Sequence, residues 1–165
     1  MIKYNKSNLP LNKVQDASMN MSVEWKKQSK VLLDEAYNNQ NMDAFKAAVI
    51  WCGTYGNVIR TVSSNDMLQF AKDLYNNISN IKNGTYSLSQ VNVYGKNQPK
   101  SYVSKICHII NPQQYPFIYD SKTKKRFKKN SINAWDGFIL TERNDSKNEP
   151  TADLYEQDSR VWASL

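Results

Sequence analysis

The sequence lacks any uninterrupted apolar run of the roughly 18 residues that a membrane-spanning helix needs. The first residues, MIKYNKSNLPLNK, also lack the apolar core of a signal peptide. These two absences predict a cytoplasmic protein with no membrane partner. No internal repeat, linker or low-complexity tract divides the 165 residues. This length suits a single domain, residues 1–165, built around one hydrophobic core.

Cysteine and histidine are scarce, with two cysteines and one histidine in the whole chain. Cys52 and Cys107 lie in separate apolar segments and form no C-x-x-C spacing. This pattern excludes a disulfide framework and indicates no zinc site. We therefore expect both cysteines to be buried, inert thiols and expect no cofactor. His108 shares a predicted helix face with Ser101 and Ser104, so we expect a partly exposed histidine.

Apolar residues recur at helical spacing through most of the chain, whereas strand-like alternation is confined to residues 86–94. Even there, Ser87 and Gln90 have a capping spacing that favours a short helix. The sequence therefore predicts an all-α fold, a single compact domain of about seven short helices. The expected helical segments are residues 23–37, 42–53, 64–81, 86–94, 99–110, 121–130 and 152–162, and residues 132–140 supply further apolar surface.

Several expectations about packing follow from these segments. The segment 42–53 has so many consecutive apolar residues that we expect it to be the central buried helix, closed by Gly53 and Gly56. Residues 143–150, RNDSKNEP, are polar and are expected to form a loop. The four tryptophans fall on helical stripes and are expected in the core; they are Trp25, Trp51, Trp135 and Trp162.

Positive charge is concentrated in one segment. The formal net charge is +7, and six positive charges come from a stretch without any acid, leaving +1 for all other residues. A dense patch on a nearly neutral body favours binding of a polyanion such as DNA, although a solvated helix face or a disordered charge run is the alternative. We name these six residues the basic cluster: Lys122, Lys124, Lys125, Arg126, Lys128 and Lys129.

Two local features precede the basic cluster. Asp120 or Ser121 is placed to cap the basic helix, after an aromatic-rich loop. Further upstream, Gly95 allows a tight turn before the helix at 99–110. Backbone N–H groups at that helix's N-terminus, with Lys96 and Lys100 at the rim, can bind a phosphate.

The stretch SKICHIINPQQYPFIYDS is similar to an SK…H…NP…YP.YDS signature found in prokaryotic and mobile-element proteins. The order of lysine-bearing helix, proline loop, aspartate and basic helix resembles the helix-hairpin-helix DNA glycosylase superfamily. The resemblance covers roughly Tyr94 to Phe127. The superfamily's hairpin usually has a Gly-x-Gly turn, whereas this chain has Gly95 alone.

The resemblance implies roles for three groups of residues. Asp120 matches the carboxylate that assists departure of a flipped-out base by stabilising positive charge on the sugar. Lys100, with Lys105 second, matches a lysine that attacks the sugar carbon and forms a Schiff base. Flipping a base also requires aromatic or apolar walls, which we assign to Tyr115, Phe117 and Tyr119.

Two functional hypotheses therefore stand beside each other. The first is a nucleic-acid-binding protein with a glycosylase-like helical core that excises a base, its basic helix and the Gly95–Lys96 turn holding phosphates. The second is a non-catalytic phage or mobile-element protein that uses its basic face to block a protein partner. In the second hypothesis Asp120 is only a helix N-cap.

Overall fold

A computed structural model describes residues 3–4 and 9–165. Over these residues the chain forms α-helices and two short 3-10 helices without a strand, which confirms the all-α prediction; Tyr94 and Asn97 form an isolated β-bridge. The α-helices are α1 (Lys13–Asn38), α2 (Met42–Thr54), α3 (Met67–Asn76), α4 (Ile78–Asn83), α5 (Lys100–Ile110), α6 (Ser121–Phe127), α7 (Ile132–Ser146) and α8 (Thr151–Ala163). The 3-10 helices are η1 (Tyr55–Thr61) and η2 (Leu88–Gln90).

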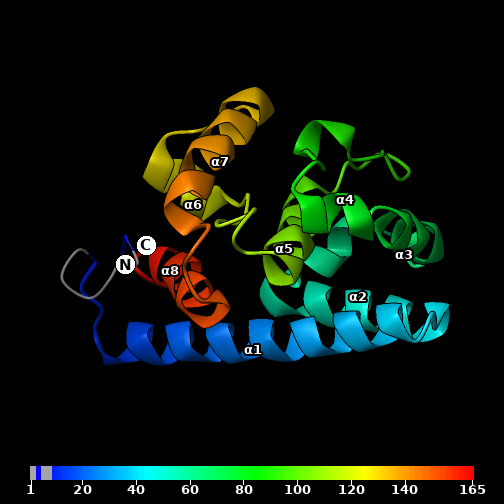
Figure 1. Ribbon diagram of the computed structural model, residues 1–165, viewed down its shortest axis with the longest axis horizontal. Helices are drawn as coiled ribbons and strands as arrows, with labels where there is room; N and C mark the ends of the chain where they lie inside the picture. Colours follow the sequence, from blue (N-terminus) through cyan, green and yellow to red (C-terminus); the bar gives the residue numbers. More distant parts are fainter. Residues whose placement is uncertain (1–2, 5–8) are drawn as a thin grey trace.

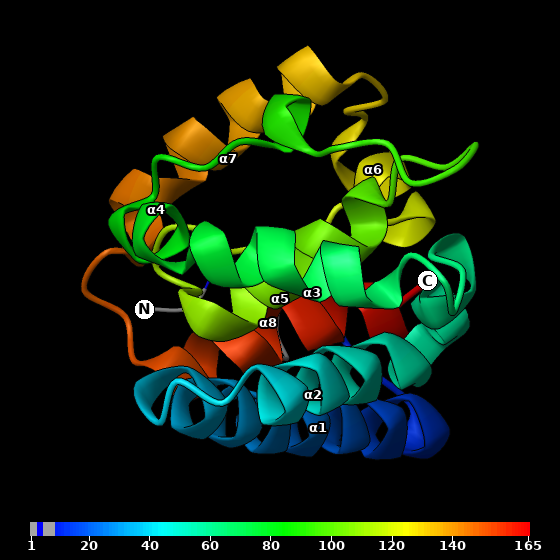
Figure 2. The same ribbon diagram turned by 90° about the vertical axis from the view of Figure 1, so that its right-hand side faces the viewer.

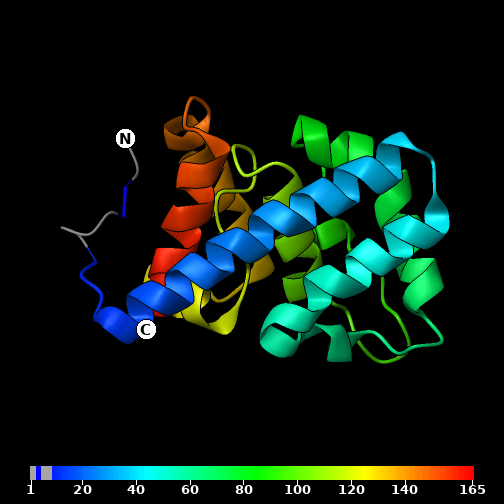
Figure 3. The ribbon, with the colours of Figure 1, turned by 90° about the horizontal axis from the view of Figure 1, so that it is seen from below.

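The long helix α1 supports the rest of the molecule and packs against α2, α5 and α8 (Figure 1). Helix α8, with α6 and α7 beyond it, lies over the N-terminal half of α1, and α2 to α4 lie over its C-terminal half (Figure 1 and Figure 3). Figure 2 shows α1 and α2 side by side at the bottom, α5 and α8 in the middle and α7 at the top. Segments distant in sequence therefore meet around α5.

The central helix is α5, not the segment 42–53 as the sequence predicts. Every residue from 102 to 110 is buried, whereas Trp51 of α2 is 37% exposed. Gly53 does not end α2; it lies against Tyr102, whose ring occupies the space of a Cβ at that position. The Tyr102 hydroxyl donates to the Val49 carbonyl at 2.5 Å. Gly53 thus allows α5 to approach α2 closely, while Gly56, at φ 78°, turns the chain.

Several helix ends differ from the prediction. Helix α1 begins at Lys13, ten residues before the predicted start at residue 23. Asn12 and Gln15 cap it reciprocally, with N–H to Oδ1 and N–H to Oε1 distances of 2.8 and 3.0 Å. Helix α7 runs to Ser146, into the predicted loop 143–150. The predicted helix 64–81 is divided at Asn77 into α3 and α4.

The scarce cysteines and the histidine are all buried. Cys52 and Cys107 are free thiols, as predicted, and burial raises the pKa of Cys52 to about 12. His108 is 0% exposed, so the expectation of a partly exposed histidine is wrong. Its Nδ1 lies 2.7 Å from the Tyr115 carbonyl oxygen, and burial lowers its pKa to about 3. The helix α5 that carries His108 is central and has no solvent-facing side for it.

Of the four tryptophans, only Trp135 is in the core. Trp25 and Trp162 are half-buried and Trp51 is partly exposed, so the prediction is wrong for these three. In the described part of the chain, none of the helices combines the length and apolar character needed to cross a bilayer.

Candidate functional site

A cavity of about 40 Å³ lies where α1, η1, α5, the loop before α6 and α8 meet. Lys105 of α5 and Asp120, the N-cap of α6, both line it. A buried ion pair between Lys26 of α1 and Asp158 of α8 forms another part of the lining. We name this cavity the lysine pocket. The structure thus brings together Asp120 and one of the two lysines that the resemblance suggests.

Asp120 is a helix cap and a pocket residue at once. Its Oδ1 accepts the backbone N–H of Thr123 at 2.8 Å and the Thr123 hydroxyl at 3.0 Å, which confirms the capping prediction. Burial, and then the nearby Asp158 carboxylate, raise the pKa of Asp120 above its ordinary value. The Thr123 N–H holds this oxygen at the N-terminus of α6, while the single hydroxyl proton of Thr123 is shared with the closer Ile118 carbonyl.

Lys105 is a buried amine with a lowered proton affinity. The residue is 8% exposed, and its Nζ donates to the Tyr55 carbonyl and lies 5.5 Å from the centroid of the Tyr55 ring. Burial, and then repulsion from Lys26, lower the pKa of Lys105 to about 8. A larger fraction of the Lys105 amine is therefore neutral near neutral pH than for an ordinary lysine, whose pKa is about 10.4. A desolvated lysine beside another cation is an activated nucleophile.

The Lys26–Asp158 ion pair in the pocket lining also holds the loop that leads to Asp120. Lys26 Nζ donates to Asp158 Oδ2 at 2.7 Å and to the Tyr155 carbonyl at 3.2 Å. Asp158 Oδ1 accepts the N–H of Ile118, two residues before Asp120, at 2.9 Å. Burial, the largest single influence, would raise the pKa of Asp158, but the charge of Lys26 and the hydrogen bonds from Lys26 and the Ile118 N–H are among the contributions that together outweigh burial and hold the pKa below its ordinary value. Asp158 is therefore ionised at neutral pH.

Three half-buried aromatic residues line the lysine pocket, and we name them the rim: Trp25, Tyr55 and Trp162. The Trp25 and Tyr55 centroids are 5.5 Å apart, and those of Tyr55 and Trp162 are 6.2 Å apart. Lys122 Nζ lies 4.1 Å from the Trp162 ring centroid and 3.4 Å from the Trp162 carbonyl oxygen. The basic cluster therefore begins at the rim of the pocket.

The basic cluster is largely accessible. Lys125, Arg126 and Lys128 are exposed, and the other three residues are half-buried. Helix α6 ends at Phe127, however, and Lys128 adopts the left-handed conformation with φ 56°. Lys122, Lys125, Arg126 and Lys129 have the spacing of one helix face, but Lys129 lies beyond the end of α6 and leaves that face. The accessible charge therefore covers one short helix and its C-terminal turn.

Some predicted site residues lie outside the pocket. Lys100, the preferred nucleophile in the sequence, is the half-buried first residue of α5 and does not line the cavity. Gly95, with φ 62°, and the exposed Lys96 form the turn closed by the Tyr94–Asn97 bridge. They do not reach the cavity either. The element before this turn is only the 3-10 turn η2, in place of the short helix predicted at residues 86–94.

The aromatic walls predicted from the sequence are core residues. Tyr115, Phe117 and Tyr119 are buried, and none of them lines the lysine pocket. The Tyr115 hydroxyl donates to the Tyr86 carbonyl at 2.6 Å, which anchors the loop before α6. We therefore do not retain a base-stacking role for these three rings at this pocket. The rings that line this pocket are those of Trp25, Tyr55 and Trp162.

Sequence reasoning did not find Trp25, Lys26 or Tyr55. One signal was present for α8, because Asp158 is a carboxylate within an otherwise apolar stripe. Comparisons of the chain with protein-family models, curated proteins and solved structures give no match. Function is therefore inferred from the geometry of the pocket and from the charge beside it.

Proposed function

We propose that this protein binds nucleic acid, in the first instance DNA, and that Lys105 and Asp120 act on a sugar carbon of the bound strand. The observation that supports this proposal is that the Lys105 amine and the Asp120 carboxylate line one cavity whose rim touches the basic cluster. In this reading the chain has a helix-hairpin-helix glycosylase-like core. The nucleophile is Lys105, not Lys100.

The proposed chemistry follows from the protonation states of the Lys105 amine and the Asp120 carboxyl group. A neutral Lys105 amine forms a bond to C1′ of the sugar while the bond from C1′ to the base breaks and the base takes the electron pair. The Asp120 carboxylate stabilises the positive charge that develops on the sugar. Where the base is already lost, the amine adds to the sugar aldehyde to give a carbinolamine. The carbinolamine hydroxyl takes a proton from solvent and leaves as water, and a cationic iminium forms.

The size of the pocket favours an abasic site over an intact nucleotide as the probe. Its volume of about 40 Å³ is far below the roughly 150 Å³ of a cavity that accommodates a benzene ring, so a complete nucleobase does not fit in this conformation. The aldehyde end of an abasic sugar is much smaller. Base excision would require the aromatic rim to open, whereas iminium formation at an abasic site would not.

A trapping experiment tests the proposal. The protein is incubated with a duplex that contains one abasic site, and sodium borohydride then reduces any iminium to a stable amine. We expect a covalent complex with the parent protein and with Lys100→Met, and none with Lys105→Met. Lys100→Met is the matched control because both lysines lie on α5 and only Lys105 lines the pocket.

Three results would reject the proposal. Trapping by Lys105→Met at the parent level would remove Lys105 from the chemistry. Duplex binding without any trapping would leave a nucleic-acid reader or blocker. If the protein neither binds the duplex nor is trapped on it, the second hypothesis is favoured, in which the basic face contacts a protein partner.

A further inference from the structure

A second cavity lies on the other side of α5. Its volume is about 170 Å³, and α7 and residues 84–88 enclose it together with α5 and the loop that follows. Ser104 lines this cavity and the adjacent Lys105 lines the lysine pocket, so the two cavities lie on different faces of α5. An apolar cavity of roughly 150 Å³ accommodates a benzene-sized ring, so this one has room for one six-membered ring, and the remainder of a larger planar ligand would lie at its opening.

The walls of this cavity are largely aromatic. They include the rings of Tyr86, Tyr115, Phe117 and Trp135. Leu140, which is 59% exposed, also lines the cavity, so the cavity reaches the protein surface. Flat aromatic walls favour a flat ligand, because ring stacking does not depend on a particular hydrogen-bond pattern.

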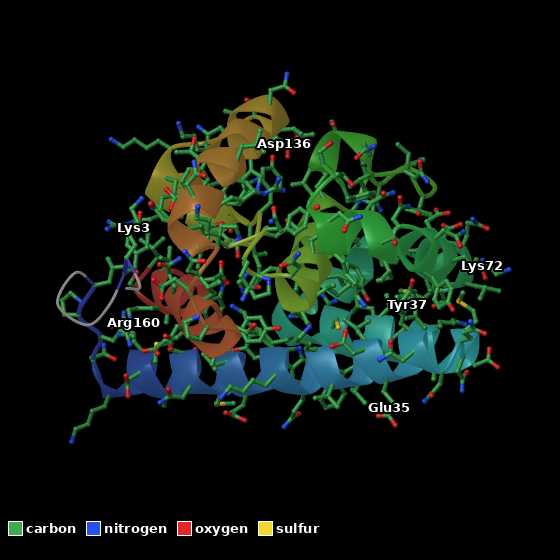
Figure 4. All side chains as sticks on the ribbon, viewed as in Figure 1. Lys3, Glu35, Tyr37, Lys72, Asp136 and Arg160 are labelled. Atoms are coloured by element: carbon green, nitrogen blue, oxygen red, sulfur yellow. The ribbon has the colours of Figure 1, made fainter. Side chains whose placement is uncertain are left out.

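Two groups of opposite charge supply the polar part of the lining. Asp136 and Arg143 are separated by seven residues on α7, about 10.5 Å along the helix axis. Asp136 lies on the side of α7 that faces residues 84–98 (Figure 4). Its carboxylate accepts from the Leu88 N–H, at a long Oδ1 distance of 3.4 Å, and from the Ser89 N–H. A carboxylate can accept about four hydrogen bonds, so lone pairs remain for a ligand.

Arg143 faces the same cavity from the next turns of α7. Its Nε donates to the Gln114 carbonyl at 2.6 Å, and its guanidinium carbon lies 5.1 Å from the Tyr115 ring centroid. These contacts fix the guanidinium plane while most of its five N–H donors remain for other partners. The lining thus offers an acceptor near one end and donors near the other.

We propose that this cavity binds a guanine base. Guanine presents N–H donors on one edge, which suit the Asp136 carboxylate, and the O6 and N7 acceptors on another, which suit the Arg143 guanidinium. Adenine presents an unprotonated ring nitrogen where guanine has N1–H, so the carboxylate would face a lone pair. The cavity therefore discriminates between the two purines. This inference is independent of the chemistry at Lys105.

Titration calorimetry of the whole protein with guanosine and with adenosine tests the inference. We expect saturable binding of one guanosine and at least tenfold weaker binding of adenosine. Asp136→Asn should weaken guanosine binding at least tenfold, because the amide oxygen can still accept from the Leu88 N–H but the charge is lost. Arg143→Gln should also weaken it. Asp145→Asn, an exposed carboxylate on the same helix that does not line the cavity, should have no effect.

Circular dichroism melting of each variant shows whether it is folded, so that lost binding is not confused with unfolding. The inference is overturned by any of three results. These are no saturable guanosine binding by the parent, equal affinities for guanosine and adenosine, or a folded Asp136→Asn that binds guanosine as Asp145→Asn does.

Discussion

Replacing Lys26 with methionine should destabilise the protein strongly. Lys26 and Asp158 form a 2.7 Å ion pair in which the two side chains are 4% and 3% exposed. Removing one partner of such a pair leaves an uncompensated buried charge, which costs about 3–5 kcal/mol. For a chain of this size, about 2–4 °C of Tm is lost per kcal/mol, so we expect Tm to fall by on the order of 10 °C.

Urea unfolding followed by circular dichroism measures the effect directly. Lys27→Met is the matched control, since its ion pair with Glu24 is exposed and 3.4 Å long, and it should change the free energy of unfolding by no more than about 0.5 kcal/mol. The double variant Lys26→Met, Asp158→Asn removes both charges and should recover much of the loss. Equal stabilities of Lys26→Met and Lys27→Met would refute the reasoning, because the Lys26–Asp158 pair would then be no more than a surface contact.

Three further predictions concern Asp120, acid unfolding and the basic cluster. Asp120→Asn keeps the cap and removes a carboxylate whose pKa is raised by burial, so thermal melting should show unchanged or higher stability; a loss well beyond about 1 kcal/mol would contradict this. The pKa of Asp158 is lowered, so its contribution to stability is present above the unfolded pKa of about 3.9 and is lost as pH falls through the folded pKa. Urea unfolding at a series of pH values should show that Asp158→Asn lacks this acid-sensitive part of the stability. A pH profile equal to that of the parent would contradict the contribution of Asp158. Lys125→Gln with Lys128→Gln should flatten the log–log salt dependence of duplex binding by about 1.8, at about 0.9 for each phosphate contact. Lys72→Gln, on α3 and far from α6 (Figure 4), should leave it unchanged; equal slopes in all three proteins would mean that the cluster does not face phosphates.

The fold was predictable wherever helical periodicity or a local cap defines an element. Asp120 is such a case, because its capping partners, the N–H and hydroxyl of Thr123, lie three residues away. The start of α1 was missed because the Asn12–Gln15 cap precedes a segment without a clear apolar stripe. The rank of α5 as central helix was also missed, since burial on every side of a helix depends on neighbours from distant segments.

The choice between Lys100 and Lys105 shows what sequence spacing leaves open. Five positions on a helix correspond to a rotation of about 140°, so the two lysines point to different sides of α5. The rotation of α5 depends on contacts with distant segments, such as that of Tyr102 with Gly53, which no local pattern reveals. The acceptor of the Lys105 amine, the Tyr55 carbonyl, is 50 residues away in sequence. The aromatic rim likewise comes from α1, η1 and α8.

Mass spectrometry of the borohydride-reduced complex tests the central claim most directly, because it locates the residue that bears the sugar. The protein is trapped on an abasic duplex over a series of pH values, digested and sequenced by fragmentation. We predict that the adduct maps to Lys105 and that its yield rises with a midpoint near pH 8, the pKa at which burial holds this amine. An adduct on Lys100 or on the lysines of the basic cluster, or no adduct at any pH, would contradict the assignment of Lys105 as the nucleophile.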